Sequence, residues 1–173
     1  PDVYTYRFDW DEEPDLLGME LSKVLGAAHG LEIAFAFNDF KGRFDTSFIY
    51  PNDEAQFALA DSMSSYWTAF AANGDPGRGQ KGEQKHWLPW GTEGKRSIIL
   101  DSPADQGIFM DDEEVTRAQI KTTLFNDGDF TDETLRCQIY ARIFRGDEFI
   151  VGEYESLGDG SCRNIDPTVV DIF

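Results

Sequence analysis

The sequence predicts an α/β fold class, in which short strands are combined with helices. Aromatic and β-branched residues mostly alternate from Val3 to Trp10, which is the period of a strand with one better-buried face. Apolar residues between Asp53 and Asn73 recur instead three or four positions apart, which is the period of an amphipathic helix. A second, short strand is predicted over Ser97 to Leu100. Both kinds of element therefore occur within 173 residues, a length that suits one domain.

The pattern is weak between the first strand and the long helix. The acidic run from Asp9 to Asp15 is broken by Pro14 and is predicted to be a solvated loop, and residues 16–28 show no clean period. Residues 31–37 are apolar apart from Glu32, and they pass into a weakly specified loop over residues 38–51. We therefore assign no regular element to this part of the chain.

The ends of the long helix are well marked. Asn52 or Asp53 can cap its start, and Asn73-Gly74 ends it. Two further helices are predicted, one that begins near Asp112 and one that stops at Gly146. The long helix is expected to bury its periodic apolar positions, which are Phe57, Ala60, Met63, Trp67 and Phe70.

The composition excludes several classes of partner. The chain carries 15 basic and 33 acidic residues, which gives a formal net charge of −18 with both histidines neutral. Such a surface would repel phosphate backbones and anionic membranes, so no nucleic-acid partner is predicted. With 40% hydrophobic and 14% aromatic residues the chain should nevertheless fold. No apolar stretch approaches the ~20 residues that cross a bilayer, so no membrane span is predicted.

The two cysteines bear on the cellular compartment. Cys137 and Cys162 are too few for a disulfide scaffold and lack the spacing of a zinc site. They could be two buried thiols, but a disulfide between them is favoured, and it would favour a secreted or periplasmic location. The compartment is otherwise unknown, because a chain that starts at Pro1 without Met is expected to lack upstream residues, including any targeting segment.

Motifs that carry chemistry are few. GxSxG, HExxH, GxGxxG and P-loop sequences are absent, and no metal or cofactor is predicted. His86 has no carboxylate or second ligand at a useful spacing and is expected to be a surface histidine. His29 lies in the run Gly26-Ala27-Ala28-His29-Gly30, whose small residues let the backbone turn and leave the imidazole accessible. A structural role is the commoner one for such a histidine, and a general-base role stays open.

Five segments follow one another in a distinctive order. Val3 to Phe8 fits VYxYxF, His29 to Ile33 fits HGxE followed by an apolar residue, Tyr66 to Pro76 fits YWxxFAxxGDP, and Trp87 to Trp90 and Ile98 to Asp101 complete the series. Their order and spacing resemble those of type B carboxylesterases, the family that includes cholinesterases and bacterial p-nitrobenzyl esterases. The resemblance is strongest over residues 3–110, and residues 111–173 are predicted to form a helical C-terminal extension.

The resemblance implies an α/β-hydrolase in which His29 takes a proton from a serine and returns it to the leaving alkoxide. The family's GxSxG serine, glycine-rich oxyanion loop and triad acid all precede the strand at residue 3, so none of them lies in this chain. No acid or serine here, including Ser64 and Ser65, is assigned to the triad. Glu32 matches the family motif and is expected to orient the loop rather than to transfer a proton.

Residues 1–173 are therefore expected to be the C-terminal segment of a single α/β-hydrolase domain, comprising its last strands and flanking helices. A missing N-terminal portion bearing the serine would complete the central sheet and act as the partner, and a small-molecule ester would be the substrate. The expected function is that of a serine carboxylesterase working through an acyl-enzyme, with the chain inactive alone. Two alternatives stay open: a non-catalytic cholinesterase-like adhesion or scaffold module, and an independent acidic binding domain.

Overall fold

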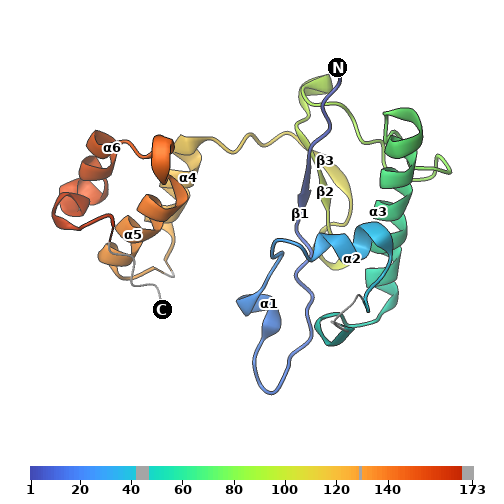
Figure 1. The fold of residues 1–173 in the computed structure, drawn as a ribbon, viewed down its shortest axis with the longest axis horizontal. Coiled ribbons are helices and arrows are strands. Elements are labelled where there is room, and N and C mark those ends of the chain that lie inside the picture. The colour runs from blue at the N-terminus through green and yellow to red at the C-terminus, as the bar shows by residue number, and fades with distance from the viewer. Residues whose placement is uncertain (42–46, 129, 169–173) are drawn as a thin grey trace. The chain divides into compact units, whose positions relative to one another are not determined.

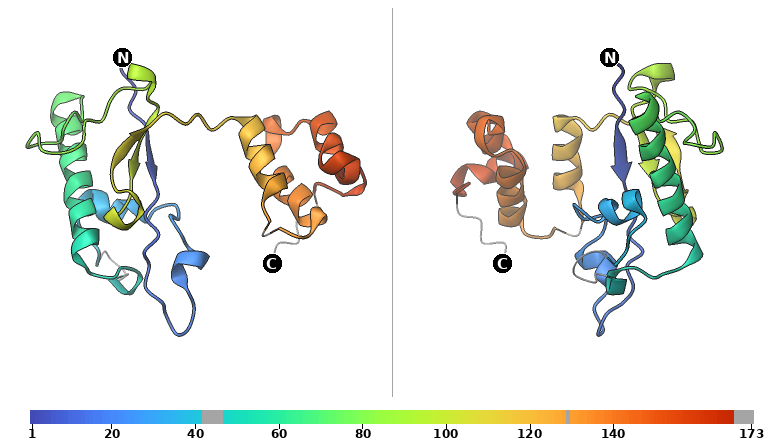
Figure 2. Two further views of the ribbon diagram at one scale, coloured as in Figure 1. Left: turned by 180° about the vertical axis from the view of Figure 1, so that it is seen from behind. Right: turned by 45° about the vertical axis from the view of Figure 1, so that its right-hand side comes forward.

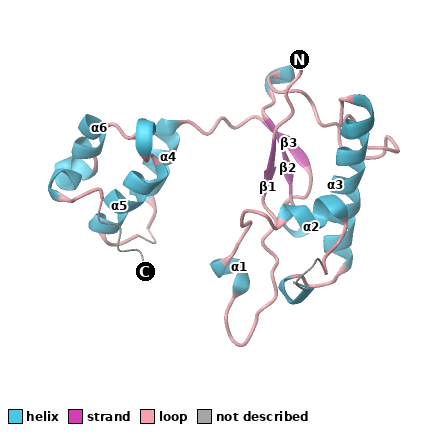
Figure 3. Cartoon of the chain, in the orientation of Figure 1, coloured by secondary structure: helices cyan, strands magenta, loops and turns pink. Residues whose placement is uncertain are grey.

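Three short strands form the sheet of the computed structural model: β1 (Tyr6–Phe8), β2 (Ser97–Leu100) and β3 (Phe109–Asp111), in the order β1-β2-β3 (Figure 1). β1 runs parallel to β2, with Arg7 opposite Ile99, and β2 runs antiparallel to β3. Helices accompany this mixed sheet, so the predicted α/β class is confirmed. Figure 3 shows how small a part of the chain is strand.

The chain divides into two units, residues 1–114 and 115–173, each with its own hydrophobic core. The structure describes residues 1–41, 47–128 and 130–168; part of the loop predicted over residues 38–51 and the end of the predicted extension lie outside these ranges. The first unit holds the sheet, α1 (Leu21–Val24), α2 (Glu32–Phe37) and α3 (Glu54–Asn73). The second unit holds α4 (Arg117–Asn126), α5 (Glu133–Ile143) and α6 (Val151–Ser156).

Helix α3 confirms the predicted long helix and its ends. The Asp53 side chain accepts a hydrogen bond of 2.8 Å from the backbone N–H of Gln56, and Gly74 closes the last turn with φ 71°. The predicted buried face is wrong at two positions, because Phe57 and Phe70 are 42% and 50% exposed. The buried residues of α3 are Gln56, Leu59, Ala60, Met63, Tyr66 and Ala69.

The elements that α3 contacts decide which of its faces is buried. Apolar residues occur on more than one side of this helix, so the spacing alone does not select one face. The Tyr66 hydroxyl donates to the Lys85 carbonyl at 2.6 Å, and the Trp67 ring lies 5.2 Å from that of Tyr6 on β1. Trp67 is therefore only partly buried, at the edge of the core.

Several other elements differ from the sequence expectations. Of the first strand predicted from Val3 onward, only the three residues of β1 form a strand. Its partner β2 is only four residues long, which limits how far the pairing can extend. Sequence patterns gave no sign of β3, α1 or α2, which are all six residues or shorter. Helix α4 begins later than Asp112, because Thr116 and Gln119 form a capping box at its start.

The core of the first unit lies between the sheet and the helices α2 and α3, which Figure 2 shows beside the strands in both views. Aromatic rings make up much of it: the Phe35 ring of α2 lies 5.2 Å from Phe8 and 5.0 Å from Trp10. The fully or nearly fully buried members are Trp10, Phe35, Phe40, Tyr50, Leu59, Ala60, Met63, Tyr66, Trp87, Ile98 and Leu100.

Replacing Met63 with alanine should destabilise the protein by about 2–5 kcal/mol, because the side chain is fully buried and its loss leaves a cavity. Denaturant unfolding measures the change in stability. Thr68→Ala on the exposed side of α3 is the matched control and should change stability little. Equal stabilities of the two variants would contradict the packing described here.

A disulfide and a network of hydrogen-bonded charged side chains hold the second unit together. Cys137 on α5 and Cys162 are both fully buried and joined by a disulfide, with Cα atoms 5.5 Å apart, as the sequence favoured. Glu153 on α6 accepts hydrogen bonds from Lys121, Tyr140 and Arg117, which together hold the pKa of its carboxyl down at about 2.

Among the described residues, no helix is long and apolar enough to span a membrane.

Breaking the disulfide should loosen the second unit selectively. Cys137 and Cys162 are 25 residues apart, so the cross-link should stabilise this unit by about 3 kcal/mol through the unfolded state. Limited proteolysis should therefore cut the double variant Cys137→Ala/Cys162→Ala faster than the parent at sites within residues 115–173. The rate of cleavage within α3 should be unchanged. Cleavage at the parent's rate in both units would contradict this role.

Candidate active site

His29 lies on the turn between α1 and α2, and its side chain is exposed. Gly26 and Gly30 have φ angles of 51° and 94°, which glycine adopts without strain, so the small residues do shape the turn as expected. Backbone hydrogen bonds order it: the N–H of Ala28 donates to the Gly26 carbonyl at 2.6 Å, and the N–H of Leu31 donates to the Ala28 carbonyl at 3.2 Å. The imidazole is thus presented to solvent on an ordered turn.

Glu32 connects this turn to the start of α2. It lies in the first turn of α2, and its Oε2 accepts a hydrogen bond of 2.8 Å from the backbone N–H of Gly30. This contact agrees with the expectation that Glu32 orients the loop. The helix is in turn fixed to the core by Phe35, which is fully buried. The position of His29 is therefore tied to the core through α2.

In the described part of the chain, the structure brings no second triad member to His29. Among residues 1–41, 47–128 and 130–168, no carboxylate or serine hydroxyl hydrogen-bonds or ion-pairs with its imidazole. Ser65 instead accepts a hydrogen bond of 2.8 Å from the Gln80 backbone N–H, which is a structural role. His86 is exposed in the loop after α3. His29 therefore remains the single predicted site residue of this chain.

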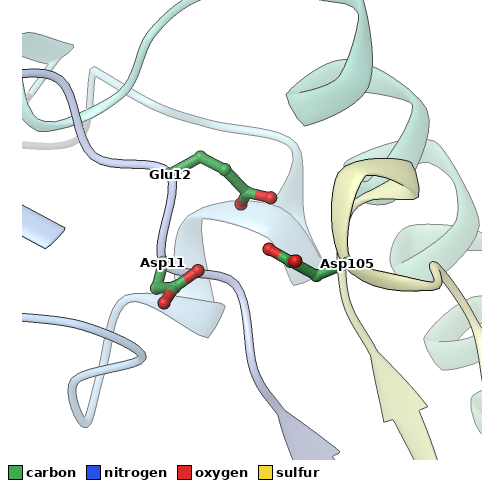
Figure 4. A group of neighbouring side chains, drawn as sticks. All are labelled: Asp11, Glu12 and Asp105. Atoms are coloured by element: carbon green, nitrogen blue, oxygen red, sulfur yellow. The ribbon is translucent and has the colours of Figure 1, made fainter.

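A group of acidic residues, which sequence reasoning missed as a cluster, lies where β1 and β2 end. The two strands are parallel, so their carboxyl ends meet at one edge of the sheet. Carboxylate oxygens of Asp11 and Glu12, after β1, and of Asp105, after β2, lie within 4.8 Å of one another (Figure 4). Exposed acids often group in this way without an ion, and we assign no metal or cofactor to them.

Two carboxyl groups at this edge have raised pKa values, Glu12 of the group and the neighbouring Asp101, which follows β2. Burial, and then the charges of Asp101 and Asp11, raise the pKa of Glu12 to about 7. Burial is also the main cause that raises the pKa of Asp101 to about 6, with Asp105 adding to it. Glu13 is only 5% exposed, so the loop predicted to be solvated from Asp9 to Asp15 is partly buried.

Comparison with known proteins decides the family. The model of the carboxylesterase family matches residues 1–118. The chain belongs to the carboxylesterase family. The resemblance inferred from the five sequence segments is thereby confirmed at the level of the family. Among solved structures, a PNB esterase is similar at 26% sequence identity and a TM-score of 0.46. That match covers 72% of this chain and 21% of the esterase, so the chain spans about a fifth of its length.

Proposed function

We propose that this chain is the C-terminal part of a serine carboxylesterase that hydrolyses carboxylic esters through an acyl-enzyme, with His29 as the general base. The placement of His29 carries the proposal: in a carboxylesterase-family chain, an exposed imidazole sits on an ordered turn within the HGxE segment. A general base needs this accessibility, because it must reach both the nucleophile and the leaving group.

The proposed reaction has two steps. His29 takes the proton of a serine hydroxyl as the serine oxygen attacks the ester carbonyl, and it gives that proton to the departing alkoxide. It then takes a proton from water as the water oxygen attacks the acyl-enzyme carbonyl, and it gives that proton to the serine oxygen as the acyl bond breaks, which releases the carboxylic acid and restores both the serine and the neutral imidazole. An N-terminal portion of the same esterase, the proposed partner, would supply the serine, the triad acid and the oxyanion donors.

The Cys137–Cys162 disulfide favours an oxidising location, secreted or periplasmic.

Labelling with a fluorophosphonate tests this proposal on the complete protein. If the proposal is right, the complete protein should be labelled on one serine outside residues 1–173 and should hydrolyse a p-nitrophenyl ester. Any variant that loses the label should also lose turnover. A complete protein that is folded but neither labelled nor active would overturn the proposal. That result would favour the adhesion or scaffold module instead.

A further inference from the structure

A side-chain hydrogen bond joins the segments that follow β1 and β2, because the Ser102 hydroxyl donates to the Glu12 carboxyl. Ser102 is 1% exposed and firmly held, because its Oγ accepts from the Ala104 N–H at 3.2 Å and its N–H donates to Asp101 at 2.7 Å. Glu12 therefore ties the first segment to a fixed point at the end of β2.

The charged side chains that act on the Glu12 carboxyl all carry the same sign of charge. Asp11, Asp101 and Asp105 face the Glu12 carboxyl, and Asp9, which is paired with Arg7, lies near Asp101. Among the residues that the structure describes, no Lys, Arg or His ion-pairs with Glu12, Asp101 or Asp105. The Oε2 atom of Glu12 is buried and has no hydrogen-bond partner there. A charge on Glu12 is thus opposed by both desolvation and repulsion.

We propose that Glu12 and Ser102 form a proton-operated latch between the segments after β1 and β2. The latch is closed while Glu12 carries a proton, and it loosens when Glu12 and Asp101 are both charged. The latch is a property of the fold and stands whether or not His29 is a catalytic residue. Its opening frees the start of the segment that leads from β1 toward α1.

The pKa values give the sign and the pH range. The pKa of Glu12 rises from 4.5 to about 7 in the folded chain, which therefore binds this proton more tightly than the unfolded chain does. The stability from the closed latch is present below pH 4.5 and is lost as pH rises through about 7. Asp101, with a pKa raised to about 6, loses its proton within the same range and adds repulsion.

Thermal unfolding of the complete protein tests the latch, with EDTA present so that adventitious cations do not compete with protons. Glu12→Gln keeps a hydrogen-bonding group and removes the charge. It should melt within about 1 °C of the parent at pH 4.5 and roughly 4 °C above it at pH 8. Asp15→Asn, an exposed acid of the same segment, should follow the parent at both pH values.

Two results would overturn the latch: a difference between Glu12→Gln and the parent that does not change with pH, or an equal gain for Asp15→Asn. Hydrogen exchange on the parent protein gives a second test that needs no variant. After correction for intrinsic rates, residues 9–13 and 101–105 should lose protection roughly tenfold between pH 4.5 and 8, while α3 keeps its protection. Unchanged protection in both segments would also overturn the proposal.

Discussion

Replacing His29 with alanine in the proposed esterase is expected to reduce turnover of a p-nitrophenyl ester by a factor on the order of 10⁴ or more. Without the imidazole, no group accepts the serine proton, so only binding and oxyanion stabilisation remain. The turn itself should survive, because its order comes from backbone hydrogen bonds and from the Glu32 contact with Gly30. Circular dichroism and the melting temperature should therefore match those of the parent.

The second histidine of the chain provides the matched control. His86 is exposed in the loop after α3, and His86→Ala should keep parental turnover. A folded His29→Ala variant with near-parental turnover would refute the general-base role. A parallel loss in both variants would show that removing either histidine perturbs the protein generally, which would also refute a specific role for His29.

Residues 1–173 expressed alone are expected to be silent toward p-nitrophenyl esters and to lack a stable, independent hydrolase domain. The general base is one of three elements that the reaction needs, and no nucleophile or oxyanion donors are assigned to this chain. Stability is expected to fail for a separate reason, because three short strands cannot cover the apolar surface that the first unit exposes. The large exposed side chains of this unit include Val3, Tyr6, Ile33, Phe37, Phe57 and Phe70.

Expression of the chain with and without the upstream portion separates these two reasons. Alone, it should give aggregated or molten material, visible as the absence of a cooperative melt. With the upstream portion, both the cooperative melt and ester turnover should return. A soluble, cooperatively melting monomer of 19.6 kDa would refute the structural half of the expectation. Serine-reagent-sensitive hydrolysis by that monomer would refute the functional half.

Local sequence determined the long elements and the family. Helix α3 could be predicted with its caps, because Asp53 and Gly74 act through hydrogen bonds and backbone angles that belong to a few neighbouring residues. Strand β2 could be predicted from its β-branched residues. The turn at His29 could be expected from Gly26 and Gly30 for the same local reason, while its suggested chemistry came from the family resemblance. The role of His29 itself stays a prediction.

Only the tertiary structure decided which side chains lose their contact with water. The buried face of α3 depends on the partners of Tyr66 and Trp67, which come from residues far along the chain or on another element. Glu12 looked like part of a solvated acidic loop, yet it meets Ser102, 90 residues away in sequence, because β1 and β2 are parallel neighbours. Desolvation and repulsion between distant residues set the pKa of such a group, and both depend on a pairing that composition and periodicity do not specify.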